Sequence, residues 1–356
     1  MKHIIAATAA LLMLTPLVSC GGGERSTPPH TEKNSVYYWK TVLQLDDDEL
    51  ALLARHDIGR VYVRMFDVVE DREGYIADNL AAPNASLRVD DDQYCLLRDS
   101  LRHLEFVPVV YITVEGLRAM KGHEGVLARN ITTRVRNMCD YDTLPNVGEL
   151  QLDCDWTPST EASFFALCDS VRHSIGQLGL DWRLSSTIRL HQLARKAPPV
   201  DRGVLMVYNT GNFNDPDARN SIIDADDVAP YLRRLPGYRL HLDVAYPTYS
   251  WQLLFSKRRF AGLLNGLELT DTTRFARRDD GLYEVLRDMP YHGRLLRTGD
   301  LVRRETSAYS DVARVKAMIE RCLEGRPHSN ILYHLDTDNL SKYTPDEIDN
   351  LLSTAL

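Results

Sequence analysis

The segment Gly148-Glu149-Leu150-Gln151-Leu152-Asp153-Cys154-Asp155-Trp156-Thr157 has the pattern of a buried strand that ends in two carboxylates and an indole. Side chains two residues apart on a strand share a face, so we expect Asp153 and Asp155 to point into one cavity. Burying two carboxylates without partners is costly, so water, a cation, a hydrogen-bond network or a ligand must compensate them. The segment therefore predicts a functional site at a strand end, with a structural polar network as the alternative.

On both sides of this segment, short β-rich runs alternate with longer amphipathic stretches, which is the pattern of repeated strand–helix units. Eight runs have the composition of strands: 36–43, 59–68, 106–113, 149–156, 182–189, 203–209, 239–246 and 330–336. Helical patterns lie between them, for example at 48–56, 94–104, 159–178, 226–235 and 251–264. The count of eight favours an α/β fold of the (β/α)8 TIM-barrel type over an open doubly wound sheet, which alternates in the same way.

One stretch, residues 267–307, does not fit the strand–helix alternation. Within it, residues 294–303 have the pattern of a β-hairpin. We therefore expect a hairpin inserted between strands seven and eight of the barrel.

The first nineteen residues combine Lys2 with an apolar run over 4–18, which suits a secretory signal peptide better than a membrane-spanning helix. The run ends at Leu17-Val18-Ser19-Cys20, which resembles a bacterial lipobox and implies cleavage before Cys20 and lipidation of its sulfur. An ordinary signal peptide is the alternative, and both export the protein. We expect a signal peptide at 1–19, a lipidated cysteine with a flexible tether at 20–34, and a barrel domain at 35–356. The expected location is the cell envelope, with membrane contact through the lipid anchor alone.

Composition narrows the function classes. The chain has 356 residues, 44% of them hydrophobic, and a net charge of −8, which gives no indication of nucleic-acid binding. The cysteines after Cys20 lack paired C-x-x-C spacing, which argues against a zinc or redox site. There is no Gly-rich phosphate loop and no G-x-S-x-G elbow, and we expect no cofactor.

The parity of each strand predicts which side chains reach the active face of a barrel, which lies at the carboxyl ends of its strands. On the second strand, for example, the apolar residues Val61, Val63 and Met65 face the helices, so Tyr62, Arg64 and Phe66 should turn inward. The polar residues expected to converge, with Asn209 at the rim, are Arg64, Glu115, Asp153, Asp155, Arg189, Tyr208, His241, Asp243 and Asp336. Barrel interiors are mostly apolar, so this set indicates a ligand site, although any one member can instead be a paired core residue, such as Arg64 with Asp153.

Two of these strands resemble glycoside hydrolase family 18, the chitinase-like barrels. The segment Leu152–Thr157 is similar to the end of that family's D-x-x-D-x-D-x-E motif, and Met206-Val207-Tyr208-Asn209 is similar to its M-x-Y motif. The resemblance implies that Asp153 and Asp155 orient and stabilise a substrate acetamido group and that Tyr208 hydrogen-bonds it. Thr157, however, occupies the position of the family's general-acid Glu, and Leu150 that of its first Asp. A threonine hydroxyl cannot protonate a leaving oxygen at neutral pH. The remainder of the chain resembles uncharacterised exported lipoprotein barrels.

Three hypotheses follow. The first is a glycoside hydrolase-like enzyme that uses Asp155 with Glu115, Asp243 or Asp336 as its second carboxylate. In that case His241 or Arg189 would adjust pKa values, and Trp156 and Trp251 would stack on sugar rings. The second is a carbohydrate-binding barrel without catalysis, which Thr157 favours. The third is a Mg²⁺ or Ca²⁺ site formed by Asp153, Asp155, His241 and Asp243, although we expect no metal.

Overall fold

The computed structural model describes residues 32–354, except residue 73, residues 75–79 and residue 280. The expected signal peptide, Cys20 and all of the tether before residue 32 lie outside the described residues. The barrel and its insertion belong to one unit, Glu32–Leu356.

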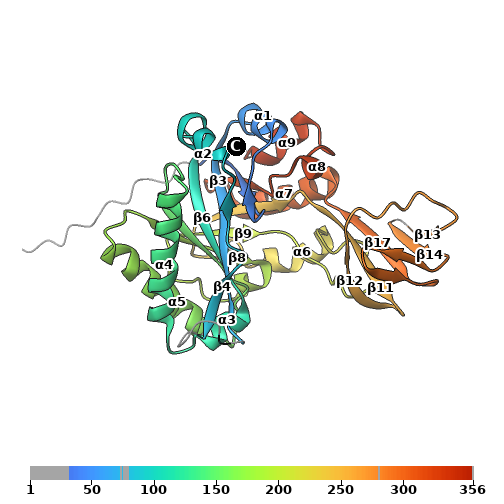
Figure 1. The fold of residues 1–356 in the computed structure, drawn as a ribbon, viewed down its shortest axis with the longest axis horizontal. Coiled ribbons are helices and arrows are strands. Elements are labelled where there is room, and N and C mark those ends of the chain that lie inside the picture. The colour runs from blue at the N-terminus through green and yellow to red at the C-terminus, as the bar shows by residue number, and fades with distance from the viewer. Residues whose placement is uncertain (1–31, 73, 75–79, 280, 355–356) are drawn as a thin grey trace, which may run out of the picture. The chain divides into compact units, whose positions relative to one another are not determined.

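Eight parallel strands close into a barrel (Figure 1), which confirms the predicted (β/α)8 fold. They are β1 (Asn34–Tyr38), β3 (Ile58–Glu70), β6 (Glu105–Ile112), β7 (Glu149–Asp153), β8 (Arg183–Arg189), β9 (Arg202–Met206), β10 (Leu242–Pro247) and β18 (Asn330–Tyr333). The ring closes because β1 pairs in parallel with both β3 and β18. A short strand, β4 (Ala81–Asn84), adds to β3 in the antiparallel direction, and β2 (Val42–Leu43) pairs with β5 (Arg88–Val89).

Helices connect the barrel strands, and two more, α8 and α9, follow the last strand. They are α1 (Asp47–Arg55), α2 (Gln93–Cys95), the π-helical η1 (Leu96–Ser100), α3 (Val114–Ala119), α4 (Glu124–Tyr141), α5 (Glu161–Gln177), the 3-10 helix η2 (Leu190–Ala194), α6 (Ala225–Leu232), α7 (Tyr309–Leu323), α8 (Thr337–Leu340) and α9 (Pro345–Leu352). Helix α1 begins with a capping box in which Asp46 and Glu49 satisfy each other's backbone N–H groups. Thr344 and Glu347 do the same at α9, where Pro345 occupies the first turn.

Two apolar layers surround the strands. The interior of the barrel holds a small cluster that includes Tyr37, Tyr62, Val109 and Met206. A much larger cluster fills the space between the strands and the helices, and Leu152 and Cys154 belong to it, as the alternation in this segment predicts. The strand residues therefore alternate between the two layers.

The insertion lies between β10 and β18, where it was predicted, and it is larger than a hairpin. Strands β11 (Ser250–Ser256), β12 (Arg259–Leu264), β13 (Phe275–Asp279), β14 (Leu282–Val285) and β17 (Leu301–Thr306) form an antiparallel sheet in the order β12-β11-β17-β14-β13. Strands β15 (Met289–Tyr291) and β16 (Arg294–Leu296) pair with each other. The two strands of the expected 294–303 hairpin thus belong to different sheets. The helix expected at 251–264 is also wrong, because β11 and β12 occupy these residues.

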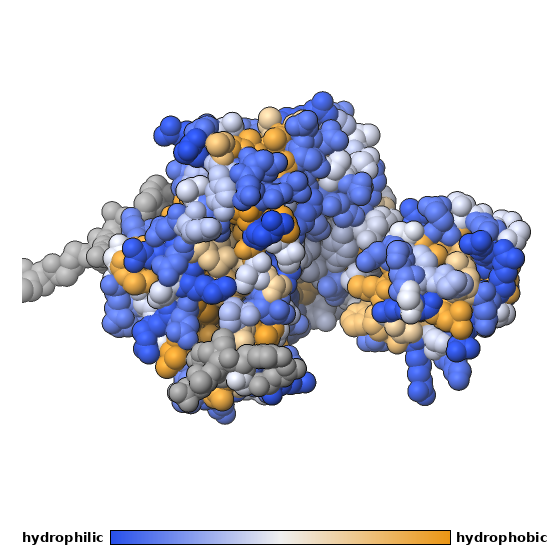
Figure 2. Space-filling view, viewed as in Figure 1, coloured by the Kyte–Doolittle hydropathy of each residue, from blue (hydrophilic) through white to orange (hydrophobic). Residues whose placement is uncertain are grey.

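Hydrophilic residues cover most of the face seen in Figure 2, with hydrophobic residues in small patches between them. None of the helices in the described part of the chain combines the length and the apolar character needed to cross a membrane.

Candidate functional site at the carboxyl ends of the barrel strands

The centre of the candidate site is an ion pair between the last residues of two neighbouring strands. Arg189 ends β8, and its Nη2 donates a hydrogen bond to Oδ1 of Asp153, the last residue of β7, over 2.9 Å. The hydroxyl of Thr187 donates to the same oxygen over 2.6 Å. Only 2% of the Asp153 side chain is exposed, so these two donors compensate its buried charge. Burial lowers the pKa of Arg189, but the neighbouring Asp153 and Tyr208 raise it by more, so the guanidinium stays charged.

Tyr208 follows β9 and lies beside this pair. Its hydroxyl is 3.5 Å from Nη1 of Arg189, and its ring stacks on Tyr333 with 4.6 Å between ring centroids. Burial raises the pKa of Tyr208 to about 12, although Arg189 lowers it. The phenol is therefore protonated at neutral pH and can donate a hydrogen bond to a ligand oxygen.

A cavity of about 290 Å³ opens at the carboxyl ends of β7, β8 and β9, and we call it the mouth cavity. Its lining residues are Tyr111, Asp155, Arg189, Leu190, His191, Met206, Tyr208, Asn209, Thr210 and Tyr231. Asp155 is the carboxylate in this lining; its side chain is 53% exposed and its Oδ1 lies 3.4 Å from Nε2 of His191. Asn209 adopts a positive φ of 53° and accepts a hydrogen bond from the Tyr249 hydroxyl over 2.8 Å. The mouth cavity thus combines one exposed acid with a charged guanidinium and three phenols.

A row of half-buried aromatic side chains runs across the carboxyl ends of the strands. Trp39 contacts Tyr333, with 5.7 Å between centroids, and Tyr333 stacks on Tyr208. Tyr249 lies 6.1 Å from Tyr208 and 5.5 Å from Trp251. Such a row provides flat apolar faces of the kind on which sugar rings pack.

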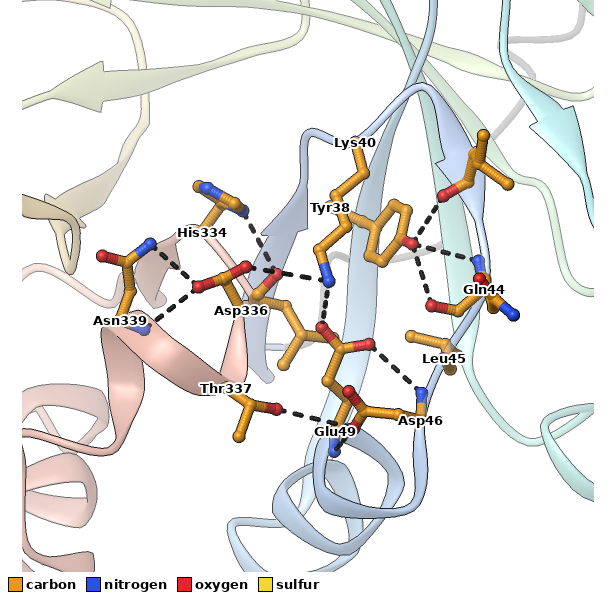
Figure 3. A network of polar contacts seen from close by, with 12 residues as sticks. Tyr38, Lys40, Gln44, Leu45, Asp46, Glu49, His334, Asp336, Thr337 and Asn339 are labelled. Atoms are coloured by element: carbon orange, nitrogen blue, oxygen red, sulfur yellow. Dashed lines mark hydrogen bonds and ion pairs between the residues drawn. The ribbon is translucent and has the colours of Figure 1, made fainter. Parts of the chain in front are cut away.

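Two other expected site residues, Asp336 after β18 and Arg64 within β3, are bound to neighbours. Asp336 accepts a hydrogen bond from the backbone of Asn339 and so caps α8, and it lies 3.8 Å from Lys40. Lys40 in turn binds the fully buried Glu49 over 2.5 Å (Figure 3). Arg64 forms a two-pronged ion pair with Asp67 and stacks over the ring of Trp39. Neither Asp336 nor Arg64 lines the mouth cavity.

The register of β3 corrects the expectation for Phe66. Arg64 is opposite Val109 on β6, whereas Phe66 is opposite Val110, so one extra residue enters β3 between them. Such a bulge reverses the parity of the residues that follow. Phe66 therefore packs in the outer layer, beneath the guanidinium of Arg134 on α4.

Two residues expected in the site point elsewhere. Strand β6 ends at Ile112, and Thr113 caps α3 at once, so Glu115 lies on the exposed side of a short helix. Its side chain is 55% exposed, and its ion-pair partner is Arg118 at 4.0 Å. Trp156 lies beyond the end of β7 and is fully buried in the outer layer, between Phe164 and Phe165. As placed, Glu115 cannot pair with Asp155, and Trp156 cannot stack on a sugar.

His241 and Asp243 lie at the opposite end of the barrel. Strand β10 begins at Leu242, so Asp243 is near its amino end, whereas Asp155 lies beyond the carboxyl end of β7. The fully buried Asp243 binds Arg202 over 2.6 Å and the backbone N–H of Ser329 over 2.8 Å. Asp153, Asp155, His241 and Asp243 therefore do not form one site. Within the described ranges, no group of three or more His, Cys, Asp or Glu residues is placed to hold a metal ion.

Trp251 lies on β11 rather than on a helix. Its indole N–H donates to Glu305 of β17 over 2.5 Å, and its ring contacts Tyr249 at the end of the aromatic row. Thr157, at the position of the missing glutamate, forms hydroxyl contacts with Ser159 and Thr160 in the turn before α5. These contacts keep the Thr157 hydroxyl bonded within the turn.

The residues near the mouth that were not among those expected from the sequence include His191, Tyr231, Trp39 and Tyr249. His191 and Tyr249 each follow the end of a barrel strand by only two residues. The position of a residue just after a predicted strand was therefore the available signal. Trp39 shares the parity of Tyr37 in β1, and Tyr231 belongs to α6, whose approach to the mouth has no signature in the sequence.

No protein-family model and no curated protein matches the sequence. Solved structures do match. A family 18 N-acetylglucosaminidase from Paenibacillus barengoltzii is 12% identical, with a TM-score of 0.52 over 90% of this chain and 100% of that chain. The spore cortex-lytic enzyme SleL of Bacillus cereus is 12% identical, with a TM-score of 0.51 over 91% of this chain and 75% of that chain. A family 18 chitinase from Cycas revoluta, in complex with (GlcNAc)4, is 10% identical, with a TM-score of 0.50 over 90% of this chain and 99% of that chain. These likenesses show that the chain has the (β/α)8 barrel fold of chitinase-like glycoside hydrolase family 18 structures.

Proposed function

We propose that the protein is an exported lipoprotein whose barrel binds a glycan at the mouth cavity. The observation that carries the proposal is the arrangement of Asp155, Arg189, Tyr208 and Asn209 around one cavity at the carboxyl ends of β7, β8 and β9. Ligands of TIM barrels bind at this end of the strands. The fold likeness to barrels that act on N-acetylated glycans supports a sugar as the ligand.

In this proposal each side chain has a distinct role. The protonated phenol of Tyr208 donates a hydrogen bond to the acetamido oxygen, and Asn209 offers an amide to a hydroxyl. Asp153 holds Arg189 in position, since its own carboxylate is buried and bonded. Asp155 and His191, both about half exposed, contact the sugar hydroxyls from the rim. The aromatic row that includes Tyr333 and Trp39 supports the adjoining ring.

Cleavage and binding without cleavage remain two candidate functions, and each has an observation in its favour. Cleavage of a glycosidic bond in most glycosidases requires two carboxyl groups, about 5 Å apart for retention and roughly 6.5–9.5 Å apart for inversion. Asp155 is the candidate proton donor, because it is the exposed carboxyl group at the mouth cavity. Binding alone is supported by Thr157 and by the single carboxylate among the described residues of the lining.

The experiment that separates them uses the full chain in detergent and a panel of N-acetylglucosamine oligosaccharides and other cell-wall glycans, assayed for binding and for cleavage. For a hydrolase, Asp155→Asn abolishes cleavage and retains binding. For a binding protein, the wild type captures a glycan without cleaving it, and Asp155→Asn weakens the capture. A wild-type protein that neither binds nor cleaves any member of the panel would overturn the proposal.

A further inference from the structure

A second and larger cavity, of about 1190 Å³, lies on the outer wall of the barrel. We call it the outer groove. Helix α4 lines one side, and residues from Ala81 to Tyr94, which include β4 and β5, line the other. The outer groove shares no lining residue with the mouth cavity. It is therefore a separate feature of the molecule.

One face of α4 supplies polar groups to the outer groove. Asn130, Arg134, Asn137 and Tyr141 follow each other at intervals of four, three and four residues, so they share a helix face. All four line the groove and are exposed, Tyr141 to 78%. Arg134 is held in place, because it donates to the Ser86 hydroxyl over 3.0 Å and stacks over Phe66. The opposite wall adds a second phenol, Tyr94.

A buried carboxyl group at the end of this face is poorly compensated. Asp142 lines the outer groove, and the residue is only 5% exposed. The one hydrogen bond of its carboxyl group within the described chain comes from the Tyr94 hydroxyl at 3.5 Å, the long limit for such a bond. Burial raises the pKa of Asp142. A buried polar group normally has partners at good distance, so Asp142 indicates a place for a hydrogen-bonding ligand.

The apolar residues beneath the groove are shielded. Phe66, Leu127 and Ile131 are each no more than 5% exposed, so these three side chains offer a ligand little surface. The groove also offers planar amides, three guanidinium groups, two carboxyl groups and two phenol rings. Sugars use this combination, since their hydroxyls need donors and acceptors while their C–H faces pack on aromatic rings.

We propose that the outer groove is a second glycan-binding site, with Tyr94 and Tyr141 against the sugar rings and Asn137, Arg134 and Asp142 bonded to hydroxyl or acetamido groups. The choice of a glycan rests on the proposed function, whereas the groove itself does not. Small-molecule pockets typically measure roughly 300–1,000 Å³. The mouth cavity is at the lower limit and suits one ring, whereas the outer groove has room for an oligosaccharide.

The test measures the affinity and stoichiometry of N-acetylglucosamine oligosaccharides, from two to six units, on the full chain in detergent by titration calorimetry. Four proteins are compared: the wild type, a groove variant (Asn137→Ala with Tyr141→Ala), a mouth variant (Asp155→Asn with Tyr208→Phe) and the control Asn350→Ala on the exposed surface of α9. We expect two sites in the wild type and the control. The groove variant should lose one of them, with affinity there reduced about tenfold or more. Tyr141→Phe keeps the ring and should retain that site.

The outcomes are distinguishable. A groove variant that keeps both sites overturns the outer groove as a glycan site and leaves the mouth proposal intact. Loss of one site in the groove variant, with no effect in the mouth variant, supports the outer groove and overturns the mouth. A wild type that binds no oligosaccharide of the series overturns both. Circular dichroism and the unfolding temperature verify that each variant is folded, as expected for substitutions of exposed residues in the groove variant.

Discussion

Arg189 and Asp153 end two adjacent strands of the barrel and form an ion pair over 2.9 Å, with 18% and 2% of their side chains exposed. Arg189 lines the mouth cavity, and the pair holds its guanidinium beside Tyr208. Buried pairs of this kind contribute mainly by fixing one arrangement, because desolvation offsets much of their attraction. The same pair therefore bears on both the stability of the barrel and the shape of the site.

Asp153→Asn should destabilise the protein by about 3–5 kcal/mol, because it leaves Arg189 charged and buried without its counterion. Urea unfolding measures this free energy. Asp217→Asn is the matched control, since Asp217 forms an exposed ion pair with Arg258 and its loss should cost at most about 1 kcal/mol. Equal effects of the two changes would contradict the structural role of the Asp153 pair.

Tyr208→Phe should weaken glycan binding at the mouth about tenfold and leave the unfolding free energy within about 1 kcal/mol of the wild type. The ring remains stacked on Tyr333, and only the phenolic hydroxyl is removed. Calorimetric titration and thermal unfolding provide the two readouts. Unchanged affinity would remove Tyr208 from the ligand contacts.

Stability should fall as pH rises because of Glu149 at the amino end of β7. Burial raises the pKa of Glu149 from 4.5 to about 7, so the folded state retains a proton that the unfolded state releases. The folded state therefore binds more protons between pH 4.5 and 7, and stability is lost across this window as pH increases. Glutamine does not ionise, so Glu149→Gln should not show this loss. From pH 4 to pH 8 its unfolding free energy should therefore rise relative to that of the wild type, by at most about 3 kcal/mol.

Unfolding midpoints of the wild type and Glu149→Gln at several pH values measure this effect. Glu105→Gln is an informative comparison. Burial raises the pKa of Glu105, but Arg60 and Lys33 lower it by more, so its charged form is favoured in the fold. This variant should lose stability relative to the wild type above the unfolded pKa and little below it. Parallel pH profiles for the wild type and Glu149→Gln would show that Glu149 ionises normally.

Trp156→Ala should cost about 3–5 kcal/mol of stability, because the fully buried indole packs against Phe164 and Phe165 in the outer layer. Glycan affinity, measured below the unfolding transition, should be unchanged. Trp156→Phe, which fills part of the space, should recover part of the stability. If a stably folded Trp156 variant lost glycan affinity, Trp156 would have to contribute to the glycan site.

Cys20→Ala should abolish lipid attachment if the lipobox resemblance holds. Metabolic labelling with palmitate in a bacterial host measures incorporation, and the fraction that sediments with membranes gives a second readout. Cys95→Ala, which removes a cysteine exposed on the surface of the domain, serves as the control. Equal labelling of Cys20→Ala and the wild type would contradict lipidation at Cys20. An ordinary signal peptide would then be the remaining interpretation of the N-terminal segment.

Part of the site was predictable because it depends on local pattern. The end of β7 and the Tyr208 segment were identified, and the structure places Asp155, Arg189, Tyr208 and Asn209 around one cavity. Parity fails beyond a strand end, since the backbone no longer alternates. Glu115 illustrates this, because β6 ends three residues earlier at Ile112 and a helix follows.

Other errors came from long-range pairing. The apolar spacing at 251–264 fits a helix, but β11 pairs with β17, which is distant in the sequence. The turn between β11 and β12 places Lys257 and Arg258 at positive φ, so the usual Asn-Gly signal of such a turn is absent. A pattern of apolar residues cannot distinguish these alternatives when the partner strand is unknown.

The sequence by itself determined the eight-strand barrel and the acids at the end of its fourth strand. The alternation of strands and helices, and of buried and exposed side chains, depends on the local order of apolar and polar residues. The tertiary structure alone decided which polar groups meet: Arg189 with Asp153 at the mouth, and Arg202 with Asp243 at the opposite end. The level of a residue along the barrel depends on the register between strands and on bulges such as the one before Phe66. These are set by contacts between distant segments, and no local pattern encodes them.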